Sequence, residues 1–183
     1  MAVSVPINTQ GVKDEESLPV VIFDEVHDAL PLEKVRCPDL KLIGQVWLDL
    51  PREAGEPLPR WGAFSPSMIT RQLDKVCILH VGDWRNDEIK FSLYGGHATE
   101  RVGNGHPLDL DQLRNDTKRM SNYQDILHRA GRAVDNAAPQ YAFKNLSWDG
   151  CEEVEYELLM LPFMPENGVS RVMQPVSSQQ RPV

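Results

Sequence analysis

The stretch from residue 58 to residue 94 constrains the fold of this chain most, because it joins a capped helix to two strands in an order that few small domains share. Ser65 suits the N-cap, and Pro66 fits the first helical position, where its missing N–H is not needed. Apolar runs over residues 76–81 and 89–94 then flank a polar turn, which is typical of paired strands. The sequence therefore predicts a short helix that leads into an antiparallel hairpin.

Two longer helices are predicted on either side of this stretch. Asp39 can cap an upstream helix, whose apolar residues recur at helical spacing until Pro51 ends the pattern. Ser121 and Gln124 form a capping box for the longest helix, which ends before Pro139. The apolar face of that longest helix contains Tyr123, Ile126, Leu127, Ala130, Ala133 and Val134.

The last third of the chain reads as three strands, over residues 141–146, 153–161 and 169–176. The middle strand alternates acidic and apolar residues, so its two sets of side chains point to opposite faces of a sheet. We expect the apolar set to face a core and the acidic set to face water. The apolar set is Val154, Tyr156, Leu158 and Met160, and the acidic set is Glu153, Glu155 and Glu157.

Length and composition indicate one folded domain with tails, since the chain has 183 residues, of which 41% are hydrophobic and 25% charged. We predict a disordered tail over residues 1–17 and a frayed tail over residues 177–183. The domain itself is expected over residues 39–176. Between tail and domain, residues 18–38 contain the apolar run Pro19–Phe23, which the sequence leaves open between a short strand and a docking segment.

The formal net charge of -8 disfavours binding to nucleic acid or to an anionic membrane surface, because both need clustered Lys and Arg. The three cysteines, Cys37, Cys77 and Cys151, are scattered without metal or redox spacing, as expected of reduced thiols in a cytosolic protein. The sequence shows no signal peptide and no membrane-spanning apolar run. We therefore predict a cytoplasmic location.

The predicted order of elements is helix, helix, strand, strand, short helices, long helix and three strands. An α+β domain with a five-stranded antiparallel sheet and helices between its second and third strands resembles the PAS domain, with an extra N-terminal helix. The residues that carry the resemblance to stand-alone bacterial PAS-like proteins are Trp47, Pro59–Trp61, Phe64–Pro66, Met68, Leu73, Ile78, Leu79, Phe91 and Leu93–Gly95. The resemblance implies a curved sheet under a helical cover, whose interior is either a solid core or a ligand cavity.

PAS domains bind small molecules, haem or flavin, sense redox state, or bind other proteins. The resemblance thus implies a sensory or regulatory protein that acts by contact with a signalling partner or as a homodimer. In haem-binding relatives a histidine on the long helix ligates iron, and His128 is the histidine there; a solvated or capping histidine is the alternative that we favour. The reactive-cysteine motif of flavin light sensors is missing from the sequence, and we predict no metal site.

Inward-facing aromatic residues are the best candidates for a ligand pocket, with plain core packing as the alternative. A histidine on the first hairpin strand could join them. The pocket candidates are His80, Phe91, Tyr123, Tyr141, Phe143 and Tyr156. The apolar stripe of the N-terminal helix could pair two subunits, through Leu40, Ile43, Trp47 and Leu50.

Three functional hypotheses follow. The first is a ligand-responsive PAS-like regulator, and the second is a ligand-free module for protein interaction. The third is a small cone-shaped α+β enzyme, for which Asp83 and Tyr94 form the best acid–base pair. Because Asp83 falls in a polar turn and the sequence shows no nucleophile beside a base, we predict that the protein is not an enzyme.

Overall fold

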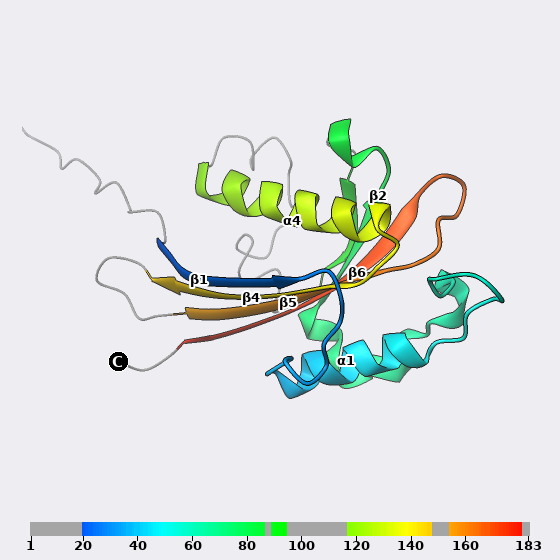
Figure 1. Cartoon of the computed structure of the whole chain (residues 1–183), viewed down its shortest axis with the longest axis horizontal. Coiled ribbons are helices and arrows are strands. Elements are labelled where there is room, and N and C mark those ends of the chain that lie inside the picture. The colour runs from blue at the N-terminus through cyan, green and yellow to red at the C-terminus, as the bar shows by residue number, and fades with distance from the viewer. Residues whose placement is uncertain (1–19, 87–88, 95–116, 148–153, 181–183) are drawn as a thin grey trace, which may run out of the picture.

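The computed structural model describes residues 20–86, 89–94, 117–147 and 154–180 (Figure 1). It confirms the α+β class and an antiparallel sheet. The helices are α1 (Pro38–Asp49) and α4 (Thr117–Asp135), with three 3₁₀ segments, η1 (Trp61–Ala63), η2 (Pro66–Lys75) and η3 (Trp84–Asn86). The strands are β1 (Val20–His27), β2 (Val76–Val81), β3 (Ile89–Tyr94), β4 (Gln140–Ser147), β5 (Val154–Pro162) and β6 (Ser170–Gln180).

The sheet has six strands in the order β1-β4-β5-β6-β2-β3, one strand more than predicted. The additional strand is β1, which includes most of the apolar run whose structure the sequence left open. It pairs with β4 from Val20 opposite Ser147 to His27 opposite Tyr141. Residues 20–27, which precede the expected start of the domain at residue 39, are therefore part of the sheet.

Helices cover both faces of the sheet (Figure 1). Helix α4 lies across one face, and α1 lies across the other face together with the segment that contains η1 and η2. Each layer encloses its own apolar core. Under α4 the core contains Leu79, Leu127, Ala130, Leu158, Met160 and Val172, and under α1 it contains Leu40, Ile43, Trp47, Tyr141, Leu159, Leu161 and Phe163.

Strand β5 is consequently buried on both faces. Leu158 and Met160 face α4, as the alternating pattern predicted, and Tyr156 packs against the same core. The expectation that Glu157 faces water is wrong, because its side chain points to the α1 side and is 5% exposed. Alternation identifies which residues share a face, but it does not show whether the second face is also covered.

Several predicted boundaries change. Helix α4 begins at Thr117, so Ser121 lies within the helix instead of capping it, and β6 reaches Gln180, four residues beyond the predicted strand. Ser65 makes no side-chain capping bond, and the segment after it is a 3₁₀ helix kinked at Ile69. The short helices expected between β3 and α4 lie outside the described residues.

The predicted dimer interface is wrong as well. Leu40, Ile43, Trp47 and Leu50 are each 5% exposed or less, because α1 packs this stripe against the chain's own sheet. Trp47 also donates a hydrogen bond from Nε1 to the carbonyl oxygen of Pro162 at 3.0 Å. Side chains that are buried within one folded chain are not available to a second copy.

The outer surface of α4 is tied to the turn after β2 by Trp84. The indole packs directly on Gly131, and a Cβ atom at that position would lie 2.2 Å from Trp84 Cδ2. Trp84 Nε1 donates to Asp135 at 3.3 Å, and the Arg85 guanidinium lies over the indole ring. A glycine is needed here because the ring occupies the space that any side chain would fill.

We therefore expect Gly131→Ala to displace Trp84 from α4. The lost contacts outweigh the better helix propensity of alanine, so the net loss of stability should be about 1 kcal/mol. The displaced indole should also move its fluorescence emission to the red. Urea unfolding and emission spectra would check both effects, with Gly62→Ala as the control, because a Cβ atom there meets nothing within 4 Å. An unchanged emission spectrum would contradict the expectation.

Candidate functional site

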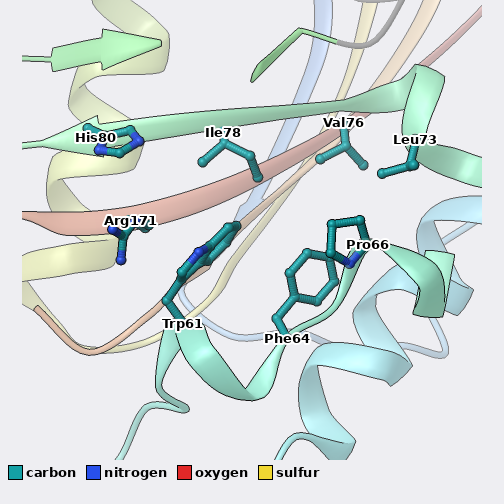
Figure 2. A pocket seen from close by; sticks show the side chains of 8 residues that line it. All are labelled: Trp61, Phe64, Pro66, Leu73, Val76, Ile78, His80 and Arg171. Atoms are coloured by element: carbon teal, nitrogen blue, oxygen red, sulfur yellow. The ribbon is translucent and has the colours of Figure 1, made fainter. Parts of the chain in front are cut away.

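A pocket of about 230 Å³ lies on the α1 side of the sheet, between the η1–η2 segment and strands β2 and β6. In Figure 2, Trp61 and Phe64 come from one side and face Val76 and Ile78, which point from β2. An engineered apolar cavity of about 150 Å³ can hold benzene, so this pocket has room for a ring with a short substituent. The lining residues are Trp61, Phe64, Pro66, Leu73, Val76, Ile78, His80 and Arg171.

Aromatic contacts hold the outer wall of the pocket in place. The ring centroids of Trp61 and Phe163 are 4.9 Å apart with an edge-to-face geometry, and Phe163 is fully buried. The Phe64 ring lies 5.4 Å from Trp61. The short 3₁₀ segments after Pro59 thus present rigid aromatic side chains to the sheet, which is the apolar lining typical of small-molecule sites.

One end of the pocket is basic. His80 and Arg171 are register partners on β2 and β6, so their side chains share one face of the sheet. The Arg171 guanidinium lies 5.4 Å from the centroid of the Trp61 ring and pairs with the carboxylate of Glu166 through Nη1. Burial, followed by the positive charge of Arg171, lowers the pKa of His80, so His80 is neutral near pH 7 and Arg171 supplies the charge of the pocket.

Four of the six pocket residues predicted from the sequence have described side chains, and of these four only His80 lines this pocket. Tyr141 and Phe143 are buried in the core on the α1 side, which is the plain packing alternative. Tyr156 packs on the opposite face of the sheet, under α4. The side chains of Phe91 and Tyr123 lie outside the described part of the structure.

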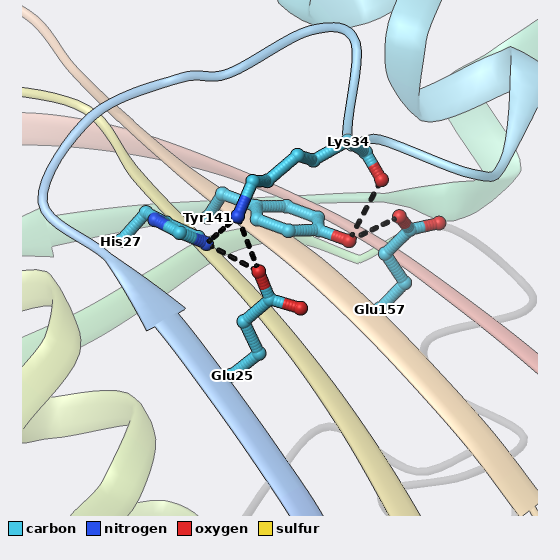
Figure 3. A network of polar contacts seen from close by, with 5 residues as sticks. All are labelled: Glu25, His27, Lys34, Tyr141 and Glu157. Atoms are coloured by element: carbon cyan, nitrogen blue, oxygen red, sulfur yellow. Dashed lines mark hydrogen bonds and ion pairs between the residues drawn. The ribbon is translucent and has the colours of Figure 1, made fainter.

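A second polar cluster surrounds Glu157 (Figure 3). Its two carboxylate oxygens accept hydrogen bonds from the backbone N–H groups of Arg36 and Cys37, each at 2.7 Å. Tyr141 Oη lies 2.9 Å from Glu157 Oε1 and 3.2 Å from the carbonyl oxygen of Lys34, and can donate to one of them at a time. The cluster therefore fastens the loop before α1 to β4 and β5.

The loop is also held at the end of β1. Lys34 Nζ donates to Glu25 Oε1 at 2.8 Å, and His27 Nε2 lies 2.6 Å from the same oxygen. The hydrogen bonds from Lys34 and then from His27 lower the pKa of Glu25 to about 2. The His27 ring is half-buried and stacks on Tyr141 at a centroid distance of 5.9 Å.

The Glu157 cluster is suited to holding the chain, not to proton transfer. Both carboxylate oxygens of Glu157 already accept backbone hydrogen bonds, which fix the carboxylate in place. Burial, followed by the hydrogen bond to Glu157, raises the pKa of Tyr141 well above its usual value, which makes the phenol a poor proton donor. We therefore assign this cluster a structural role.

The remaining candidate residues do not form a site in the described structure. His128 is exposed on α4 and meets the Trp84 ring edge to face, so it points away from the core between α4 and the sheet. Asp83 accepts hydrogen bonds from the backbone of Arg85 and the side chain of Asn86, as a turn residue does, while the side chain of Tyr94 is outside the described part. Within residues 20–86, 89–94, 117–147 and 154–180 no cluster of three His, Cys, Asp or Glu side chains could hold a metal ion.

Sequence reasoning missed most of the pocket. Trp61, Phe64 and Leu73 were among the residues that carried the resemblance, but their irregular segment gave no periodic pattern that would assign them to a face of the sheet. Of the helices described, none has the length and apolar character needed to cross a membrane. Comparison of the chain with protein-family models, curated proteins and solved structures finds no match.

Proposed function

We propose that this protein is a PAS-like regulatory domain that binds a small molecule in the pocket between Trp61 and Arg171 and signals by contact with a partner protein. The observation that carries the proposal is the pocket itself, an apolar slot with a single basic end. Such a slot binds an amphipathic small molecule without any catalytic group. A cytoplasmic location is part of the same proposal.

The order of elements supports the PAS-like part of the proposal. The resemblance rests on five antiparallel strands with the long helix between the second and the third. Strands β2, β3, β4, β5 and β6 are antiparallel to their neighbours, and α4 lies between β3 and β4 in the chain. Strand β1 is an addition to that plan at the edge next to β4.

Two observations favour a ligand-binding domain over an enzyme and over a ligand-free interaction module. Glu157 and Tyr141, a buried carboxylate beside a tyrosine, are held by backbone hydrogen bonds and serve as a structural clamp. Each face of the sheet has its own core of buried residues, and the pocket beside the α1-side core leaves about 230 Å³ between aromatic and aliphatic side chains. A ligand-free interaction module would not need this space.

Native mass spectrometry of protein purified gently from its own cells tests the proposal. We expect a bound small molecule on the natural chain and on Met68→Trp, and its loss from Leu73→Trp. Leu73 lines the pocket, so a larger ring there fills it, whereas Met68 belongs to the same 3₁₀ segment but is 47% exposed. Retention of the ligand by a folded Leu73→Trp variant would show that the molecule binds elsewhere. The same spectra report the number of subunits, and hence whether the protein forms the expected homodimer.

A further inference from the structure

The polar end of the pocket is basic although the whole chain is acidic. Arg171 carries a permanent positive charge, and its guanidinium fork matches the geometry of a carboxylate. The register partner of His80 on β6 is Arg171, so the charge of Arg171 lies beside a neutral imidazole at this end of the pocket. In a chain with a formal net charge of -8, this local arrangement favours an anionic group.

An anionic group already sits against Arg171. The carboxylate of Glu166 pairs with Arg171 Nη1, and Glu166 belongs to the turn that joins β5 to β6. The backbones of Glu166 and Val169 exchange two hydrogen bonds, of 2.9 and 3.1 Å. Asn167 and Gly168 between them both have positive φ, of 53° and 79°, as a two-residue hairpin turn requires.

This turn can release Arg171 without disturbing the sheet. Asn167, Gly168 and Val169 are exposed, and the backbone bridge between Glu166 and Val169 lies outside the strand pairs of the sheet. The Glu166 and Arg171 side chains are both partly exposed, so their ion pair is worth only a few tenths of a kcal/mol to about 1 kcal/mol. A competing carboxylate with an apolar body in the pocket would gain the burial of that body in addition.

We infer that the ligand of this pocket is a small organic acid, with an apolar body about the size of one ring, whose carboxylate replaces that of Glu166 on Arg171. The inference rests on the proposed function and adds the chemical class of the ligand. The apolar body lies between Trp61, Phe64 and Ile78, and the acid group points to the basic end. Binding frees the turn at Glu166–Val169, so a ligand event inside the pocket changes a surface segment that a partner protein can read.

Calorimetric titration with cinnamate and with its neutral analogue cinnamamide tests this inference. The natural chain should bind cinnamate more tightly than cinnamamide. Arg171→Gln should weaken cinnamate binding by about tenfold to a hundredfold, as expected for a lost charge-assisted hydrogen bond. Glu166→Gln should strengthen it by about two- to fivefold, because the internal competitor is removed.

Two control variants remove exposed ion pairs elsewhere in the chain. Arg132→Gln breaks the pair with Asp28 on the α4 side, and Glu53→Gln breaks the pair with Arg60. Both should bind cinnamate as the natural chain does. Binding of cinnamamide should change by less than about twofold in Arg171→Gln and Glu166→Gln, since the amide makes no ion pair. If Arg171→Gln does not fold, the cinnamate affinity of Glu166→Gln still tests whether the ligand carboxylate competes with Glu166 for Arg171.

Each contrary outcome has a distinct meaning. Equal binding of cinnamate and cinnamamide, with no gain in Glu166→Gln, overturns the acid as ligand class but leaves the pocket as the binding site. Absence of binding by both compounds overturns the inference, while the proposed function is judged separately by the Leu73→Trp experiment. Amide hydrogen exchange at Val169 should become faster when cinnamate saturates the protein, and unchanged exchange would overturn the release of the turn.

Discussion

Replacement of Glu157 by alanine is expected to lower the free energy of unfolding by about 3–5 kcal/mol, because two backbone donors lose their acceptor and the Tyr141 hydroxyl keeps only the more distant carbonyl oxygen of Lys34. The two backbone donors are the N–H groups of Arg36 and Cys37, and the Tyr141 hydroxyl loses its partner at 2.9 Å. An unpaired buried donor costs about 1–3 kcal/mol. The loss would be a large part of the stability of a domain of this size.

Urea unfolding followed by circular dichroism would measure this effect. Glu155→Gln is the matched control, since Glu155 lies two residues away on the same strand, is partly exposed and is 3.7 Å from Arg36. Its loss should cost less than about 1 kcal/mol. Glu157→Gln should fall between the two variants, because its amide keeps one acceptor oxygen and turns two donors toward the other backbone N–H.

Hydrogen exchange gives a second and local reading of the same change. If Glu157 fastens the loop before α1, the amides of residues 34–37 should exchange much faster in Glu157→Ala than in Glu155→Gln. A global loss of stability without faster exchange in this loop would point to a general packing defect. A loss below about 1 kcal/mol would contradict the clamp altogether.

The periodic elements of the sheet could be predicted from the sequence because their patterns are local. The predicted strands 76–81 and 89–94 coincide with β2 and β3, and the alternation in β5 correctly placed Leu158 and Met160 in one core. Strand β1 could not be assigned, since its partner β4 lies more than a hundred residues away and a short apolar run carries no information about its neighbour. The same limit applies to Glu157, whose acceptor role depends on a loop that is distant in the chain.

The pocket could not be predicted because it depends on how an irregular segment docks. Trp61 and Phe64 precede a kinked 3₁₀ helix, whose residues follow neither a period of 3.6 nor a period of 2. Arg171 joins them from the far end of the chain. Its place beside His80 follows from the pairing of β2 with β6, which the sequence pattern does not specify.

The apolar stripe of α1 is a similar case, and it leads to the second large expected effect. Trp47→Ala should lower the free energy of unfolding by about 3–5 kcal/mol, as is usual for a buried aromatic side chain replaced by alanine. Trp47 is 2% exposed, bonds to Pro162 and lies under the Arg52 guanidinium, whose carbon is 4.9 Å from the centroid of the Trp47 ring. Leu48→Ala, one residue further along the same helix, should cost less than about 1 kcal/mol, because Leu48 is 37% exposed.

The two variants also separate a core helix from a subunit interface. An interface residue would leave the fold of each chain intact when it is truncated, and the solution mass would fall. Truncation of a core residue lowers the urea midpoint, and the protein that stays folded keeps the solution mass of the natural chain. We expect the second result for Trp47→Ala, measured by urea unfolding together with light scattering. A normal urea midpoint with a halved solution mass would show that α1 forms a subunit interface. In that case Trp47 could not occupy its observed place under Arg52.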